Sequence, residues 1–219
     1  MSAAMSSPGE GRAGLLSKGL ALEGLTIGWN VVEAGLAIAS GVAAGSVALT
    51  GFGLDSVIEL VTAGALFARL RAEQRGADAG VDRRARRIVG VAFLALAAYV
   101  VVEAAITVVF KRTPEATRVG VAVALLAAIV MPALGLAKLR VGKAIASRAL
   151  VADAKCSLAC AWLSVAVLVG VGLNAAFGWW WADPVAALVM VPLLVREGRE
   201  ALEESRGKAS TCACHGGCS

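Results

Sequence analysis

The stretch IVGVAFLALAAYVVVEAAITVVF, Ile88–Phe110, contains a single charged side chain, Glu103. About 20 consecutive apolar residues are enough for a helix to cross the hydrocarbon core of a bilayer. We therefore expect a transmembrane helix here, and five other runs meet the same requirement. They are Leu20–Ser40, Val47–Leu70, Val119–Leu139, Leu150–Leu173 and Pro184–Glu200. The predicted fold class is all-α, an integral membrane bundle of six transmembrane helices.

The composition supports a membrane protein and argues against two other classes. Of the 219 residues, 58% are hydrophobic and 17% are charged, and the mean hydropathy is +0.77. A soluble domain of this length needs more polar side chains to cover its surface. The formal net charge of +5 does not indicate nucleic-acid binding, because the basic residues gather at helix ends without interleaved stacking aromatics.

The basic residues predict the orientation. Three segments are rich in them, after the second, fourth and sixth runs, whereas the turns at Gly41–Gly45 and Asn174–Ala182 carry no charge. The positive-inside rule places the basic side in the cytosol. Both termini are therefore expected to be cytoplasmic, with the plasma membrane as the location. The residues are Arg69, Arg71, Arg75, Arg83, Arg84, Arg86, Arg87; Lys138, Arg140, Lys143, Arg148; and Arg196, Arg199, Arg206, Lys208.

Three parts are expected along the chain. Residues 1–17 form a flexible N-terminal tail, residues 18–204 the six-helix membrane domain, and residues 205–219 a tail rich in Cys and His. Gly24 and Gly28 form a GxxxG pair in the first run, which allows close approach of a second helix. We interpret that pair as packing within the bundle rather than as a dimer face.

Ionisable and thiol side chains inside the runs are costly in a bilayer and indicate a functional site. Asp55 and Glu59 are spaced i, i+4 and share one helix face, and Cys156 and Cys160 have the same spacing on another helix. If the two helices pack together, these four side chains converge near the middle of the bilayer. The alternative is that the acids are protonated and hydrogen-bonded, with the cysteines as small apolar core residues.

The donor types point to a transition metal. Carboxylate oxygens and thiolate sulfurs at a four-coordinate centre suit Zn²⁺, and two thiolates shift the preference toward softer ions such as Cd²⁺. Lys155 is turned away from the cysteines around the helix, so we expect it to reach the interface, the alternative being an ion pair with an acid such as Glu33 or Glu103. The tail places Cys212, Cys214, His215 and Cys218 together, which predicts metal capture, the alternative being an inert tail.

Three stretches resemble one known family, the cation diffusion facilitator transporters. SVALTGFGLDSVIEL (Ser46–Leu60), LVADAKCSLACAWLS (Leu150–Ser164) and GWWWADPVAALVMVPLLVREGREAL (Gly178–Leu202) are similar to its second, fifth and sixth helices. The resemblance implies metal ligands at Asp55, Glu59, Cys156 and Cys160, with Asp153 in a supporting position behind them. Only Asp55 keeps the residue usual in the family. The chain is most similar to a short branch that lacks the cytosolic C-terminal domain.

The resemblance also implies a function. It predicts proton-coupled efflux of a divalent transition-metal cation by alternating access, in a homodimeric secondary transporter that is not an enzyme and needs no resident cofactor. The transported ion would be Zn²⁺ or Cd²⁺. Two alternatives remain open at this point: a membrane-embedded metal sensor or scaffold that moves no ion, and a thiol redox protein that uses Cys156 and Cys160.

Overall fold

The computed structural model describes residues 8–75, 83–113 and 117–206, and these form six helices with no strand. Each predicted run lies in a separate helix, apart from Phe110, which follows the end of its helix. The all-helical prediction is therefore confirmed. The helices are α1 (Pro8–Ala44), α2 (Val47–Gln74), α3 (Arg83–Val109), α4 (Arg118–Ala144), α5 (Arg148–Phe177) and α6 (Ala182–Ser205).

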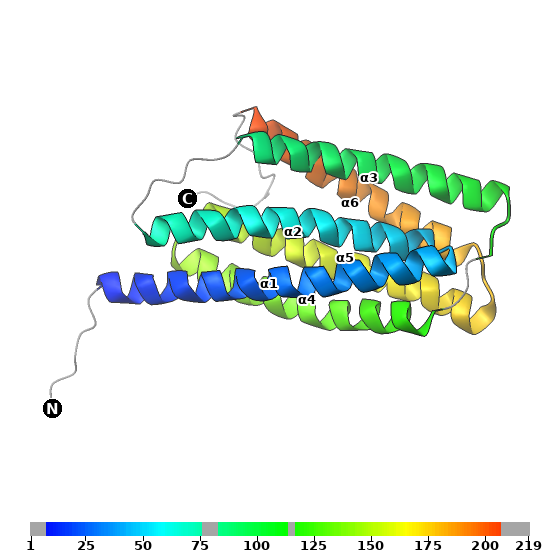
Figure 1. The fold of residues 1–219 in the computed structure, drawn as a ribbon, viewed down its shortest axis with the longest axis horizontal. Coiled ribbons are helices and arrows are strands. Elements are labelled where there is room, and N and C mark those ends of the chain that lie inside the picture. The colour runs from blue at the N-terminus through cyan, green and yellow to red at the C-terminus, as the bar shows by residue number, and fades with distance from the viewer. Residues whose placement is uncertain (1–7, 76–82, 114–116, 207–219) are drawn as a thin grey trace, which may run out of the picture.

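Five of these helices, α1 to α5, are long and apolar enough to cross a membrane. Helix α6 falls outside that group because charged residues stand in its first turn and in its second half, beginning with Asp183 and Arg196. It nevertheless runs alongside α3 for most of its length (Figure 1). Five spans thus follow from length and composition, and the sixth remains a prediction.

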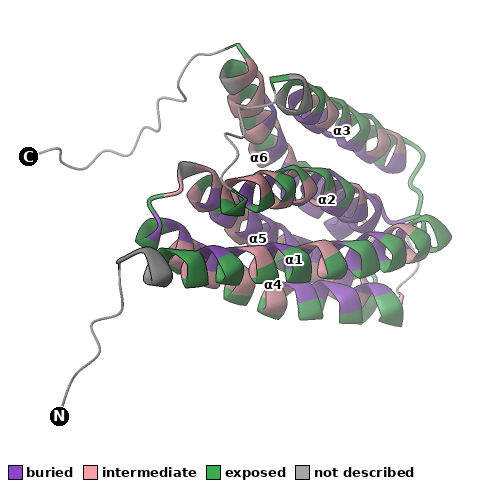
Figure 2. Cartoon of the chain, turned by 60° about the vertical axis from the view of Figure 1, so that its left-hand side comes forward, coloured by how far each residue is buried: buried purple, intermediate pink, exposed green. Residues whose placement is uncertain are grey.

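The helices lie lengthwise in a single bundle. Helices α1, α2, α4 and α5 form a group of four, and α3 and α6 pair beside it (Figures 1 and 2). Figure 2 shows buried faces turned inward and exposed faces turned outward. Large apolar side chains stand on the outside, including Leu25 (62% exposed), Val42 (68%) and Trp162 (65%). An apolar exterior on this scale is suited to lipid rather than to water.

One end of the bundle collects the basic segments. The start of α1, the end of α2, the start of α3, the end of α4, the start of α5 and the end of α6 all lie at the left of Figure 1. The arginine-rich stretches of the sequence adjoin these helix ends. The charge asymmetry along the chain is therefore an asymmetry of the folded bundle, as the positive-inside rule requires.

Helix α1 begins earlier than expected. It starts at Pro8, so residues 8–17 are helical where the sequence suggested a flexible tail. Tertiary contacts explain the extension, because Leu16 is buried in a small apolar cluster that contains Leu70 and Leu150. In addition, Arg12 Nη2 lies 2.9 Å from Glu73 Oε1 of α2.

The GxxxG pair of α1 does not pack within the bundle, so that interpretation was wrong. A Cβ added to Gly24 or Gly28 would meet no atom within 4 Å. The polar side chains of α1 turn inward and rotate these glycines to the outside. The close contact between α1 and α2 occurs elsewhere, since a Cβ at Gly41 would lie 2.6 Å from Thr50 N and one at Gly53 only 2.8 Å from Ile38 N.

The start of α2 is tied to the start of α6. Ser46 caps α2 by accepting a hydrogen bond from Leu49 N at 3.1 Å. Its hydroxyl donates to the carboxylate of Asp183, which also accepts from Val47 N at 2.9 Å and Ala48 N at 3.3 Å. A carboxylate is favourable at a helix N-terminus, where backbone N–H groups lack partners. The Asp-Pro sequence at the beginning of α6 thus holds that helix against α2.

Candidate metal centre

Three of the four predicted ligands meet in the interior. The ligand atoms of Asp55, Glu59 and Cys160 all lie within 4.8 Å of one another, and all three residues are buried. Asp55 and Glu59 come from the buried face of α2, and Cys160 reaches them from α5. We call these three residues the donor trio. Metal binding by the donor trio is a prediction that its geometry permits.

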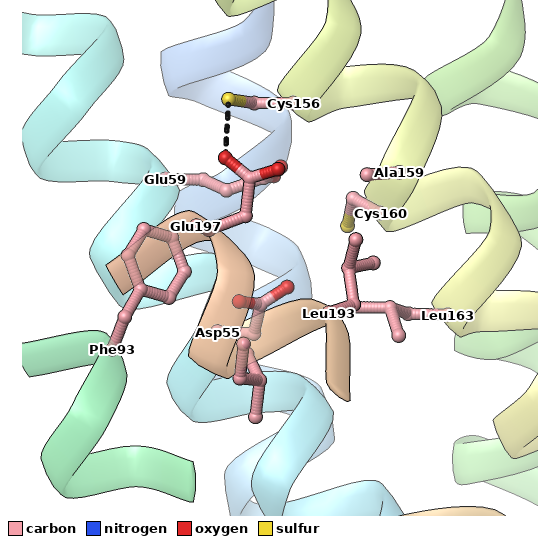
Figure 3. Close-up of a pocket in the computed structure, with 10 residues that line it drawn as sticks. Asp55, Glu59, Phe93, Cys156, Ala159, Cys160, Leu163, Leu193 and Glu197 are labelled. Atoms are coloured by element: carbon pink, nitrogen blue, oxygen red, sulfur yellow. Dashed lines mark hydrogen bonds between the residues drawn. The ribbon is translucent and has the colours of Figure 1, made fainter. Parts of the chain in front are cut away.

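Cys156 lines the same cavity but has a different neighbour. Its Sγ lies 3.5 Å from Glu197 Oε2 of α6 (Figure 3). Cys156 sits one helical turn from Cys160, toward the start of α5, so it lies nearer the basic end of the bundle. Glu197 was not among the residues predicted for the site. A signal was available, because Glu197 stands inside the sixth predicted run, where an ionisable side chain needs a reason.

The cavity is small and has both polar and apolar walls. Its volume is about 20 Å³, and a cavity needs roughly 10–15 Å³ to hold one water molecule. There is therefore room for one ion stripped of most of its water. The lining residues are Asp55, Glu59, Phe93, Cys156, Ala159, Cys160, Leu163, Leu193, Leu194 and Glu197.

Helix α1 supplies polar neighbours to the donor trio. Asn30 Nδ2 donates a hydrogen bond to Glu59 Oε2 at 3.4 Å, and the side chain of Asn30 is fully buried. One turn further along α1, Glu33 Oε1 accepts from Ser56 Oγ at 3.0 Å and lies 4.0 Å from Cys160 Sγ. The site is therefore built from α1, α2 and α5, with α6 on the side of Cys156.

Asp153, which the family resemblance places in a supporting position, is paired with a lysine in the structure, and its supporting role stays a prediction. Its Oδ2 lies 2.5 Å from Lys138 Nζ of α4, which also lies 3.3 Å from Glu23 Oε2 of α1 and 3.4 Å from Ser157 Oγ. Lys138 and Glu23 are fully buried. We call Glu23, Lys138 and Asp153 the buried ion cluster, and it joins three helices.

The prediction that Lys138 belongs to the basic segment after the fourth apolar run is wrong. Lys138 lies inside α4 with 0% exposure. The sequence held the signal, because Lys138 falls within the predicted run Val119–Leu139, where a lysine needs a partner. Lys155, by contrast, is exposed on α5 and does not point into the cavity, in agreement with its expected direction. The tail residues Cys212, Cys214, His215 and Cys218 lie outside the described residues.

Together, the fold and the site define a class of protein. An apolar helical bundle that encloses carboxylates and a thiol around a cavity of ion size is typical of a membrane protein, and a cation in this cavity is the prediction that the donors support. Acids spaced i, i+4 in such an interior repel each other unless a proton or a cation lies between them. Oxygen and sulfur donors in this mixture suit a transition-metal ion.

Comparison with known families makes the class specific. Residues 25–207 match the model of the cation efflux transmembrane domain. This match covers most of the chain, so the protein belongs to the cation efflux, or cation diffusion facilitator, family. It is therefore a transporter of metal cations across a membrane and not an enzyme. A search among curated proteins gave no match that would narrow the assignment.

Proposed function

We propose that the protein exports a divalent transition-metal cation, Zn²⁺ or a softer ion such as Cd²⁺, from the cytosol across the plasma membrane. The observation that carries this proposal is the donor trio, with three buried ligand atoms within 4.8 Å of one another. Zn²⁺ is commonly held by four such donors, and thiolate ligands favour the softer ions. Mg²⁺ and Ca²⁺ prefer oxygen ligands alone, so the thiol argues against them.

The path of the ion begins at the basic end of the bundle. Cys156 and Glu197 line the cavity on that side, and their side chains are in contact. An ion that enters from the cytosol meets this pair before it reaches the donor trio. The cavity holds about 20 Å³ within the packed interior, so passage requires the helices to open alternately to the two sides.

Protons are the proposed counter-ions. A metal binds only deprotonated carboxylates and thiolates, so binding releases protons and protonation releases the metal. A site made of Asp55, Glu59 and Cys160 thus couples cation and proton movement through the same atoms. We infer that a proton gradient drives export by antiport.

Two further parts of the proposal rest on the family resemblance and on the residues of the C-terminal tail, respectively. The first is a homodimer. Its test is the molecular mass of the purified protein in detergent, corrected for bound detergent, and a monomer would contradict it. The second is metal capture by Cys212, Cys214, His215 and Cys218, which would deliver ions to the cavity.

The test of transport is flux into everted vesicles or proteoliposomes under an imposed pH gradient. Zn²⁺ and Cd²⁺ should accumulate only when the gradient is present. Asp55→Asn should reduce the flux to that of empty vesicles, whereas Glu103→Gln, which changes a half-buried acid of α3, should keep it. Absence of flux with every tested ion, or full flux from Asp55→Asn, would refute the proposal.

The same experiment separates the alternatives. A sensor or scaffold would bind metal and show no flux. A thiol redox protein would tolerate Asp55→Asn. In the structure both thiols are free, Cys156 Sγ lying 3.5 Å from Glu197 Oε2 and Cys160 Sγ 4.0 Å from Glu33 Oε1.

A further inference from the structure

Glu33 of α1 is a buried acid that the family resemblance does not assign to the metal site. Its side chain is 0% exposed, and its Oε2 makes no hydrogen bond, with the indole N–H of Trp29, which also makes none, as a polar neighbour of the carboxylate. Buried polar atoms are nearly always hydrogen-bonded, so an unpartnered carboxylate oxygen in an apolar bundle requires an explanation. A metal ion that binds only during transport would explain it.

Glu33 lies close to the residues that we propose bind this ion. Its Oε1 lies 4.0 Å from Cys160 Sγ, and Cys160 belongs to the donor trio. Bonds of about 2.0–2.3 Å to Zn²⁺ in a tetrahedral site put neighbouring ligand atoms roughly 3.3–3.8 Å apart. Glu33 is not among the residues that line the cavity, and its Oε1 already accepts from Ser56, so the carboxylate has to turn toward the cavity before both atoms can contact one ion. Ser56, on the turn of α2 that carries Asp55, holds Glu33 in place through a 3.0 Å hydrogen bond.

The donor trio also lacks a fourth ligand. Structural sites for Zn²⁺ almost always offer four protein donors. The residue expected from the sequence, Cys156, is in contact with Glu197 of α6 instead. Asn30, one turn before Glu33, already contacts Glu59 Oε2 at 3.4 Å, which shows that this face of α1 borders the ligands of α2.

We propose that Glu33 is the fourth ligand of the transported ion, so that the site consists of three carboxylates and one thiolate from α1, α2 and α5. This inference rests on the proposed function, because it concerns the same ion at the same site. It changes the expected selectivity. One sulfur among three oxygens favours borderline ions such as Zn²⁺ and Co²⁺ over Cd²⁺, compared with a site that contains two sulfurs.

The ligand count can be measured directly. The full-length protein, with Cys212, Cys214 and Cys218 changed to serine so that tail sulfurs do not contribute, is loaded with one equivalent of Zn²⁺. X-ray absorption spectroscopy then counts sulfur and oxygen neighbours. We expect one sulfur and three oxygens. Two sulfurs would overturn the proposal in favour of the pair Cys156 and Cys160.

A substitution provides the second measurement. In the same background, Glu33→Gln keeps the size and hydrogen bonding of the side chain but removes its charge. It should raise the Kd for Zn²⁺ at least about 10–100-fold, the loss typical of groups that support metal ligands. Glu103→Gln is the matched control and should bind like the parent. Ser56→Ala should raise the Kd less than Glu33→Gln does.

The outcomes separate this inference from the proposed function. If Asp55→Asn abolishes binding and flux while Glu33→Gln binds like the parent, the inference fails and the transport proposal stands. If Asp55→Asn also leaves binding and flux unchanged, the transport proposal itself fails. Should Glu33→Gln not fold, as judged by circular dichroism and gel filtration, Ser56→Ala replaces it, because it removes the hydrogen bond to Glu33 Oε1; a Kd equal to that of the parent then overturns the inference.

Discussion

Replacing Lys138 with methionine tests the buried ion cluster. Methionine keeps the length of the side chain and removes the charge that faces Glu23 Oε2 at 3.3 Å and Asp153 Oδ2 at 2.5 Å. The side chains of Lys138 and Glu23 are 0% exposed and that of Asp153 is 11% exposed, so water cannot replace the lost partner. Removing one member of a buried pair typically destabilises a protein by about 3–5 kcal/mol.

That free energy converts to a measurable temperature shift. For a chain of 150–250 residues, 1 kcal/mol corresponds to roughly 2–4 °C in Tm, so Lys138→Met should lower Tm by about 6–20 °C. The assay is far-UV circular dichroism during heating of the full-length protein in one fixed detergent. Metal-free buffer keeps ligand binding out of the comparison.

Two variants make the reasoning refutable. Lys155→Met alters an exposed lysine on α5 and should change stability by no more than about 0.5 kcal/mol. Adding Glu23→Gln and Asp153→Asn to Lys138→Met removes the uncompensated charges and should recover part of the lost Tm. If Lys138→Met melts like Lys155→Met, or if the triple variant is no more stable than the single one, the buried ion cluster does not stabilise the fold.

Five other substitutions have defined outcomes. Asp183→Ala removes the carboxylate that accepts hydrogen bonds from the first N–H groups of α2, and it should lower the free energy of unfolding by about 1–3 kcal/mol. The same melting assay measures this change. An unchanged Tm would show that the contact between α2 and α6 does not stabilise the protein. Gly41→Ala should lower the free energy of unfolding by about 1–3 kcal/mol, because its Cβ would lie 2.6 Å from a backbone atom of α2. Gly28→Ala is the control. Its Cβ meets no atom within 4 Å, so the free energy of unfolding should stay the same or rise by up to about 1 kcal/mol. Cys160→Ser should weaken Cd²⁺ binding at least about 10-fold, and Cys156→Ser should weaken it less; equal losses by calorimetry would contradict the geometry of the donor trio.

Much of the site could be predicted because helical periodicity is local. With 3.6 residues per turn, Asp55 and Glu59 share a face in any helix that contains them, and so do Cys156 and Cys160. The convergence of Asp55, Glu59 and Cys160 confirms that α2 and α5 face each other. Local periodicity could not show that the two cysteines on this face of α5 have different neighbours. Cys160 lies beside the acids of α2, whereas Cys156 contacts Glu197 of α6.

The charged residues show the same division. The run Val119–Leu139 already contained Lys138, but only a structure could identify Glu23 and Asp153 as its partners, because one belongs to α1 and the other to α5. The same holds for Glu33. Its spacing from Asn30 indicates a polar face of α1, but it does not indicate which residues of other helices contact that face. Partners from distant segments depend on how helices cross.

By itself, the sequence determined the class of fold, the number of apolar runs and the side of the bundle that carries the basic residues. These properties depend on the length of each apolar run and on the positions of the charged residues in the sequence. Neither requires a tertiary contact. Only the tertiary structure decided which donors share one cavity, where Lys138 finds its partners and how early α1 begins. The physical reason is that each helix presents several faces, and packing against its neighbours selects the face that is buried.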